Sequence, residues 1–167
     1  LDQAKADVLK GGEPATDTLT VHSADGGSYN VVVNITGAND AATITAAAGG
    51  DYAVLEDGGV ANGTAGDPSA SGDLEITDVD GGEAVFVAAT ALELAGTYGD
   101  FTFDETTGGW GYTLDQAKAD VLKGGEPATD TLTVWSADGT DSHTITVNIT
   151  GANDAATITA AAGGDYA

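Results

Sequence analysis

The sequence predicts an all-β domain, an antiparallel β-sandwich with one short helical insertion. Three observations lead to this prediction. Apolar and polar residues alternate along several short segments, which is the pattern of half-buried strands. Turns rich in Gly, Asp and Asn separate these segments at the spacing of an antiparallel sandwich. The chain also contains an internal repeat, and its length is that of one such domain.

The repeat is nearly exact. Residues 1 to 26 return at 114 to 139 with a single change, and residues 33 to 53 return unchanged at 147 to 167. The offset is 113 residues in the first block and 114 in the second, because the intervening stretches differ by one residue. Solenoid units are shorter, at about 20 to 50 residues. The repeat therefore predicts an array of sandwich domains.

The repeat also sets the domain organisation that we expect. Residues 1 to 40 are the C-terminal part of one repeat, residues 41 to 154 are a complete repeat, and residues 155 to 167 begin the next one. Only the middle copy contains a whole domain. We therefore expect the chain to be a piece of a longer protein with many similar domains.

The strands of the complete copy are expected in the following order. Residues 43 to 45 and 52 to 55 are the weaker candidates. The stronger ones carry apolar residues on one face, namely Leu74 and Ile76, the continuous run 85 to 87, Phe101 and Phe103, Trp110 and Tyr112, Leu132 and Val134, and Ile145, Val147 and Ile149.

One segment has helical rather than strand character. Asp115 is a good N-cap, the residues after it are good helix formers ending in Lys123, and Gly124 suits the position after a helix. We expect a short helix that crosses between strands. The expected fold is therefore an immunoglobulin-like or cadherin-like antiparallel β-sandwich with this helical insertion.

The composition excludes several classes of function. The chain has 27 acidic residues and 4 lysines, which gives a formal charge of −23. It should repel nucleic-acid phosphates and anionic membrane surfaces, so neither is an expected partner. The chain lacks cysteine, so disulfides and thiolate sites are excluded. Its longest apolar stretch, 84 to 95, is shorter than the roughly 18 residues of a membrane helix.

We do not expect an enzyme. His22 is replaced by Trp135 in the other copy, and His143 lies in the stretch that differs between the copies. Residues that vary so freely within one protein are poor candidates for catalysis. We expect the carboxylates to lie in solvated loops rather than in apolar pockets that would raise a pKa for acid catalysis.

The acidic residues gather in loops at strand ends. The groups are Glu56 with Asp57; Asp78 with Asp80 and Glu83; Asp138 with Asp141; and Asn153 with Asp154, which repeat Asn39 and Asp40. Closely spaced carboxylates repel one another unless a cation neutralises them. Ca²⁺ takes six to eight oxygen ligands from flexible loops, whereas Mg²⁺ requires a tighter octahedron. Calcium is therefore the cofactor that we expect.

A second interpretation applies to each group, because Asp and Asn also favour turns for their own hydrogen-bonding reasons. For Glu56 and Asp57 a solvated turn is at least as good an interpretation as a metal site. Asp115 is better explained as a helix N-cap than as a ligand. For Asp78 and Asp80, next to the Asn-Asp pair at a domain junction, we predict calcium.

These residues carry a resemblance to a known family. The chain resembles the VCBS repeat in a series of strings that occur in a fixed order. They are LEDGG at 55 to 59, SGDLEITDVDGGEAVF at 71 to 86, GTYGDFTFD at 96 to 104 and WGYTLD at 110 to 115, followed by TDTLTVWSADG and TVNITGAND within 129 to 154. This resemblance implies a tandem domain of a very large adhesin on the surface of a Gram-negative bacterium, exported by type I secretion as RTX-type adhesins are, and active in biofilm formation.

A looser resemblance is to cadherin repeats, which have an A-x-D-x-G motif and an Asn-Asp linker. It implies calcium ligands from Asn39, Asp40, Asp78, Asp80 and Asp138. A mirror site at the other end would use Asn153, Asp154 and Glu56 with a domain outside this chain. The linker continues with two alanines and lacks the second Asn and the Pro of the cadherin form.

The expected function is that of a calcium-binding extender repeat in a secreted, extracellular adhesin, made rigid by ions between domains. The alternative is a module that binds a carbohydrate or protein ligand. Trp110, Tyr112 and Trp135 could form a sugar platform, although core positions fit their alternation better. The expected partners are neighbouring repeats, surface glycans or proteins, and a second copy that swaps strands with the half-repeat at 16 to 36.

Overall fold

The computed structural model of the chain describes residues 2–159. The chain folds into two compact units. Among the described residues, the first contains 2–45, Leu74–Val87 and Val134–His143, and the second contains Ala46–Asp73, Ala88–Thr133 and 144–159. Within the described part, no helix is long and apolar enough to cross a membrane.

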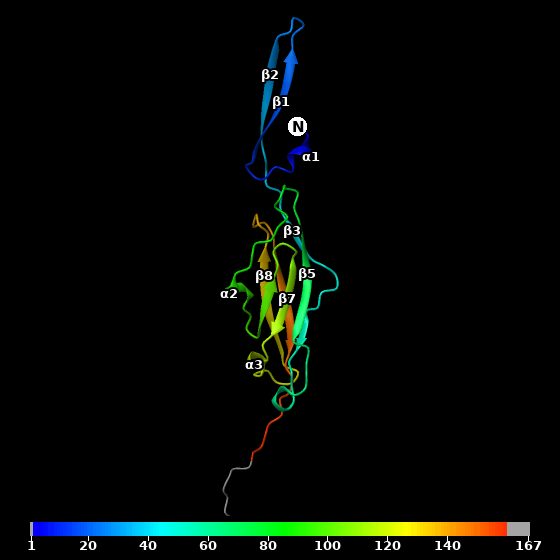
Figure 1. The fold of residues 1–167 in the computed structure, drawn as a ribbon, viewed down its shortest axis with the longest axis vertical. Helices are drawn as coiled ribbons and strands as arrows, with labels where there is room; N and C mark the ends of the chain where they lie inside the picture. The colour runs from blue at the N-terminus through cyan, green and yellow to red at the C-terminus, as the bar shows by residue number, and fades with distance from the viewer. Residues whose placement is uncertain (1, 160–167) are drawn as a thin grey trace, which may run out of the picture. The chain divides into compact units, whose positions relative to one another are not determined.

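Strands dominate the structure, and they form three sheets (Figure 1). The first is a separate antiparallel hairpin of β1 (Pro14–His22) and β2 (Ser28–Thr36). The second has the order β3-β5-β7-β6, with bounds Thr43–Ala46, Ser69–Thr77, Gly109–Leu114 and Gly99–Phe103. The third has the order β4-β9-β8, with bounds Ala53–Leu55, Ser142–Thr150 and Pro127–Trp135.

This arrangement confirms the predicted fold class. A four-stranded sheet together with a three-stranded sheet is typical of an immunoglobulin-like sandwich. Strands β5, β7 and β6 pair antiparallel, whereas the short β4 runs parallel to β9, with Val54 opposite Ile149. The run 85–87 forms a single bridge, Phe86 to Ser136, rather than a full strand. Its alternation puts Phe86 inside and exposes Val85 and Val87.

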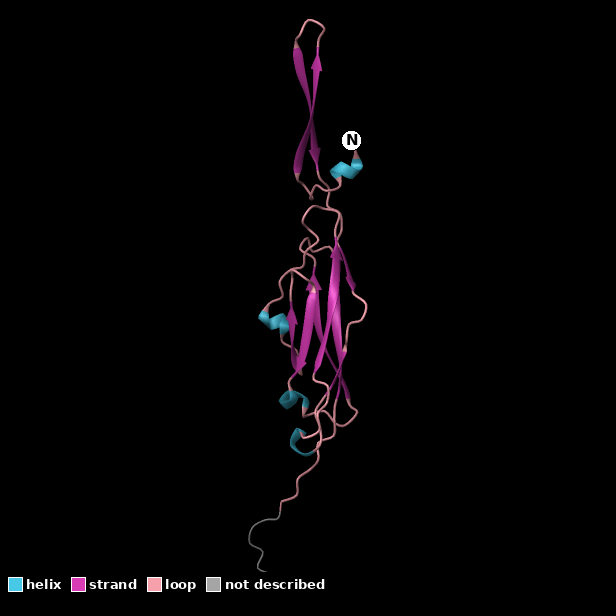
Figure 2. Cartoon of the chain, turned by 45° about the vertical axis from the view of Figure 1, so that its right-hand side comes forward, coloured by secondary structure: helices cyan, strands magenta, loops and turns pink. Residues whose placement is uncertain are grey.

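The helices are short (Figure 2). They are α1 (Gln3–Ala6), α2 (Ala91–Leu94), α3 (Gln116–Ala119) and the 3-10 turn η1 (Val60–Asn62). The predicted insertion is α3, reduced to one turn, and the carboxylate of Asp115 caps it by accepting the amide of Ala117 at 3.0 Å. Helix α2 was not predicted. It begins with a reciprocal capping box between Thr90 and Glu93.

The core follows most of the predicted alternation. Trp110 and Tyr112 are buried, as are Leu132 and Val134. Trp135, for which a core position was preferred, is 48% exposed, so that interpretation was wrong. The reason is the period of the strand: residues 130, 132 and 134 face inward along β8, so residue 135 must face outward.

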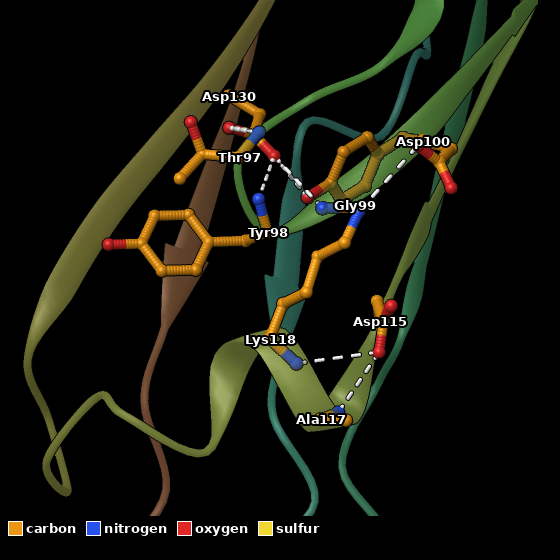
Figure 3. Close-up of polar contacts among 9 residues, drawn as sticks. Thr97, Tyr98, Gly99, Asp100, Asp115, Ala117, Lys118 and Asp130 are labelled. Atoms are coloured by element: carbon orange, nitrogen blue, oxygen red, sulfur yellow. Dashed lines mark hydrogen bonds and ion pairs between the residues drawn. The ribbon is translucent and has the colours of Figure 1, made fainter.

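One buried carboxylate organises the second unit (Figure 3). Asp130 on β8 accepts the amides of Thr97 and Tyr98 at 2.8 Å each and the amide of Gly99 at 3.1 Å. It also accepts the hydroxyl of Tyr112 at 2.8 Å. Burial, and then the carboxylate beside it, raise the pKa of Tyr112 well above the usual range, so this hydroxyl remains a donor. Asp130 thus ties the loop before β6 to strands β7 and β8.

Candidate metal sites

The loop after β5 and the turn after β8 bring acidic residues together in the first unit. We call this group, made of Asp78, Asp80, Glu83, Asp138 and the pair Asn39 and Asp40, the Asp80 cluster. One carboxylate oxygen from each of Asp78, Glu83 and Asp138 lies within 4.8 Å of the others. Two glycines with positive φ, Gly82 at 80° and Gly139 at 72°, allow these turns to form.

Backbone and side-chain hydrogen bonds hold the Asp80 cluster in place. The amide of Asp40 donates to Asp80 Oδ2 at 2.8 Å, and the amide of Asp80 donates to Asp78 Oδ1 at 2.9 Å. The side-chain amide of Asn39 donates to Asp138 Oδ2 at 3.3 Å. Hydrogen bonds from the hydroxyl of Thr140 and then from Ser136 hold the pKa of Asp138 far below its usual value. Asp138 is therefore ionised at neutral pH.

Several carboxylate oxygens of this cluster are buried without a hydrogen-bond partner. They are Asp78 Oδ2, Asp80 Oδ1 and Glu83 Oε2. Asp80 is only 2% exposed. The nearest positive charge is Lys10, whose Nζ lies 3.6 Å from Glu83 Oε1. A buried carboxylate oxygen without a partner is costly, and a cation bound here would satisfy all three oxygens.

A second group lies within the second unit. We call it the Glu56 cluster, and it consists of Glu56, Asp57, Asp120 and Asp154 with Gln116 and Asn153. Carboxylate oxygens of Glu56, Asp120 and Asp154 lie within 4.8 Å of one another. Glu56 is 1% exposed; its Oε2 accepts the amide of Ala152 at 2.8 Å, while its Oε1 is buried without a partner. The Glu56 cluster therefore also contains a buried carboxylate oxygen without a hydrogen-bond partner, as the Asp80 cluster does.

Electrostatics in the Glu56 cluster are unfavourable without a cation. Burial raises the pKa of Glu56, and the carboxylates of Asp154, Asp120 and Asp57 raise it further. The amide of Asp57 donates to Gln116 Oε1 at 3.0 Å, which leaves Gln116 Nε2 buried without a partner. A divalent ion would relieve the repulsion and keep Glu56 ionised.

The linker is fixed beside this cluster by backbone hydrogen bonds. The amide of Gly59 donates to the carbonyl of Asn153 at 2.9 Å, and the amide of Ala155 donates to the carbonyl of Gly59 at 2.8 Å. Gly59 has φ of 87°, which only glycine adopts readily. The turn after β4 thus holds the Asn-Asp pair next to Glu56.

Both clusters offer oxygen ligands from carboxylates and amides on loops. This donor set suits a hard cation such as Ca²⁺. The orphaned buried oxygens fit the same interpretation, because a cation would satisfy all of them. These oxygens can bind an ion and so link the segments that carry them.

The structure places the residues predicted from the sequence in two groups. Asn39, Asp40, Asp78, Asp80 and Asp138 meet in the Asp80 cluster, and Glu56, Asn153 and Asp154 lie in or beside the Glu56 cluster.

Other residues in these regions were missed or have another role. Glu83 was noted among the acids but was not predicted as a ligand. Asp120 was missed altogether, although its position just after α3 repeats that of Asp7. Asp141 has a different role, since it accepts the amide of Ile44 at 2.7 Å and holds β3.

Comparisons with known proteins add little to this geometry. No family model matches the chain, and the search of curated proteins gave no significant match. Among solved structures, the chain is similar to a cadherin ectodomain, PcdhgB3 EC1-4, at 13% sequence identity with a TM-score of 0.29. The match covers 81% of this chain and 38% of that one.

Proposed function

We propose that the chain is a calcium-binding spacer module, an extender repeat of a secreted bacterial adhesin. The observation that carries this proposal is the set of buried, unpartnered carboxylate oxygens in both clusters. Their burial is costly for a metal-free chain and favourable for a metal-bound one. The order of motifs, which resembles the VCBS repeat, supports the placement in an extracellular adhesin that acts in cell adhesion and biofilm formation.

The repeat suggests how the two clusters work together. The pair Asn39 and Asp40 belongs to the Asp80 cluster, and its copy Asn153 and Asp154 belongs to the Glu56 cluster. In an array, each such linker would have Glu56-type carboxylates on one side and Asp80-type carboxylates on the other. Calcium would then bind between neighbouring repeats and restrain the linker. Without calcium, the carboxylates repel and the linker is released.

The proposed role is structural and involves no catalytic step. Outside the cell, calcium is near millimolar, which suits extracellular sites with dissociation constants of about 10⁻⁴ to 10⁻³ M. Metal binding is then coupled to folding, since ions that bind only the folded state stabilise it. Secretion would deliver the chain from a low-calcium compartment to one where it folds and stiffens.

Isothermal titration tests the proposal. We expect Ca²⁺ to bind the wild-type chain and Mg²⁺ to bind at least tenfold more weakly. The double variant Asp78→Asn with Asp80→Asn should lose binding at the Asp80 cluster. The variant Asp73→Asn with Glu75→Gln removes two charges from exposed positions on β5 and serves as the matched control. Equal binding by the two double variants would refute the metal site.

A second function, binding of a glycan or protein ligand, is favoured by one observation. Trp135 is half exposed, and the amide of Val87 donates to its backbone carbonyl at 2.9 Å, so exposed Val87 lies on the adjacent segment. Aromatic side chains on an open face are typical of ligand contacts. Binding of surface polysaccharides or adhesin ligands that is abolished by Trp135→Ala would support this role, and unchanged binding would dismiss it.

A further inference from the structure

The 3-10 turn η1 and the glycine after it form a surface loop beside the Glu56 cluster. Val60 is 64% exposed, and Gly63 is exposed as well. Asn62 is half-buried, and its Nδ2 donates to Asp120 Oδ1 at 2.9 Å. Asp120 supplies one of the carboxylate oxygens of the Glu56 cluster that lie within 4.8 Å of one another. The side-chain amide of Asn62 is thus one hydrogen bond away from a candidate metal ligand.

The sequence of this loop gives Asn62 a chemical neighbour that the other asparagines lack. Asn62 is followed by glycine, whereas the other five asparagines of the chain are followed by Val, Ile or Asp. Glycine has no Cβ, so its backbone nitrogen is open to approach. That nitrogen can attack the side-chain carbonyl carbon of the preceding asparagine. Asn62 is therefore the asparagine of this chain that loses its side-chain amide most readily.

The backbone of the loop is strained, and two hydrogen bonds hold it closed. Ala61 has φ of 49° and ψ of 51°, and Asn62 has φ of 54°. This left-handed conformation is tolerated by Asn but is unfavourable for Ala. The amide of Gly63 donates to the carbonyl of Val60 at 3.1 Å, and Asn62 is held by Asp120. Opening of the loop relieves the strain and frees both the amide nitrogen and the side chain to react.

We propose that Asn62 is a modification site, at which hydrolysis of the side-chain amide adds a carboxylate to the Glu56 cluster. In the opened loop, the nitrogen of Gly63 attacks Cγ of Asn62. The new C–N bond closes a succinimide ring, the bond from Cγ to Nδ2 breaks, and Nδ2 leaves as ammonia with the proton of the attacking nitrogen. One water molecule then opens the ring at either carbonyl and gives aspartate or isoaspartate. Both products carry one free carboxylate.

The modification changes the charge that faces Asp120. A donor nitrogen is replaced by a carboxylate, so the hydrogen bond to Asp120 is lost and the two carboxylates repel each other in the metal-free chain. Calcium sites bind more tightly as the number of charged ligands rises. We therefore expect the modified loop to strengthen calcium binding at the Glu56 cluster. This consequence rests on the proposed function, whereas the hydrolysis itself does not.

Peptide mapping of the full chain tests the modification site. The chain is incubated in EDTA at mildly alkaline pH, and cleavage after glutamate then releases residues 57–75, which contain Asn62 and no other asparagine. We expect this peptide to gain the mass of an amide-to-acid conversion, and the isoaspartate fraction to accept a methyl group from isoaspartyl methyltransferase. The reaction should be about tenfold faster than at the other asparagines. Hydrolysis of Asn62 that is no faster than theirs would overturn the proposal.

A variant of Gly63 tests the identity of the nucleophile. The backbone angles of Gly63, φ of −76° and ψ of −4°, are open to alanine. Its Cβ would lie 3.0 Å from the carbonyl oxygen of Val60, so the melting temperature is measured alongside. We expect Gly63→Ala to slow the hydrolysis at Asn62 about tenfold, because the added Cβ crowds the attacking nitrogen. An unchanged rate in the folded variant would overturn the proposed mechanism.

Two substitutions of Asn62 separate the new charge from the lost hydrogen bond. Asn62→Asp carries the carboxylate of the product, and Asn62→Ala loses the same hydrogen bond without adding charge. Both are made in the background of Asp78→Asn with Asp80→Asn, so that isothermal titration reports on the Glu56 cluster. We expect Asn62→Asp to bind calcium about fivefold more tightly than this background, and Asn62→Ala to bind no more tightly.

The outcomes of the two experiments distinguish the modification from its consequence. Equal calcium affinity of Asn62→Asp and Asn62→Ala would overturn the link between the modification and the Glu56 cluster. A wild-type chain that binds no calcium would refute the proposed function and this link together. The peptide-mapping result decides the modification site in either case, because it is obtained in EDTA.

Discussion

The amide of Asp40 donates to Asp80 Oδ2 at 2.8 Å, so a linker residue is tied directly to a carboxylate that is almost fully buried. The other oxygen of Asp80 has no hydrogen-bond partner. A cation at this oxygen would connect the linker and the loop after β5 through one side chain. The proposed effect of calcium on the linker rests on this contact.

The charge of Glu56 should destabilise the metal-free protein. Its pKa is raised in the folded state, so its protonation favours folding, and that contribution is lost as pH rises through the raised pKa. Glu56→Gln should therefore raise the melting temperature in EDTA at pH 7 by about 2 to 4 °C. This rise corresponds to a gain of about 1 kcal/mol in the free energy of unfolding. The gain should vanish towards pH 4, where Glu56 itself becomes protonated.

In calcium the same substitution should have the opposite sign, because it removes a ligand. Melting curves from pH 4 to 8, with EDTA or with calcium, measure both effects. Glu75→Gln removes the same charge from an exposed position on β5 and is the control. A Glu56→Gln variant that is less stable than the wild type in EDTA at pH 7 would contradict this account.

Asp130 should be structural and independent of metal. Asp130→Ala would leave three backbone amides and a tyrosine hydroxyl unpaired, and we expect a loss of about 3 to 5 kcal/mol in the free energy of unfolding. Tyr112→Phe removes one of these bonds and should cost about 1 to 2 kcal/mol. Urea denaturation in EDTA and in calcium measures both losses, which should be the same in the two buffers.

The repeat provides a control for this prediction. Asp17→Ala changes the same sequence position in the hairpin β1-β2, where the side chain is exposed. It should alter the main unfolding transition by less than about 0.5 kcal/mol. A large effect of Asp17→Ala, or a calcium-dependent effect of Asp130→Ala, would show that the role of Asp130 has been misassigned.

Lys10 should weaken metal binding at the Asp80 cluster. Its ammonium lies 3.6 Å from Glu83 and competes with a cation for that carboxylate. The pair is partly exposed, so the effect should be modest, about 1 kcal/mol or roughly fivefold in calcium affinity. We expect Lys10→Gln to bind calcium about fivefold more tightly in isothermal titration at low salt.

Lys123 is the matched control for Lys10, because both follow the same residues, ADVL. Lys123 is exposed, and no ion pair to it is found among residues 2–159. Lys123→Gln should leave calcium affinity within twofold of the wild type. If both variants tighten binding equally, net charge rather than the contact with Glu83 is responsible.

Much of the fold could be predicted from the sequence, because burial along a strand has a period of two. The alternation of Leu132 and Val134 with polar residues gave β8 and its inner face. The same rule could have placed Trp135 outside, had the strand period been given more weight than aromatic character. Helix α2 was missed because it is only four residues long and lies shortly after the apolar run 85–87, which had indicated a strand.

The candidate site was predictable where its residues come from one loop, or where the resemblance to cadherin repeats linked distant segments, as it did for Asn39, Asp40 and Asp138. Asp78 and Asp80 are two residues apart, and their spacing signals a common ion. Asp120 joins Glu56 only because α3 passes beside the turn after β4, which no local pattern reveals. Asp130 was missed for the same reason, since its amide donors lie 31 to 33 residues away in sequence.

Thermal unfolding in excess EDTA, in millimolar CaCl₂ and in millimolar MgCl₂ tests the central claim most directly. The account predicts a rise in melting temperature of roughly 5 °C or more that is selective for calcium. The double variant Asp78→Asn with Asp80→Asn should lose much of this rise, and Asp73→Asn with Glu75→Gln should keep it. An identical melting temperature in EDTA and in calcium would contradict the account and leave both clusters as solvated acidic turns.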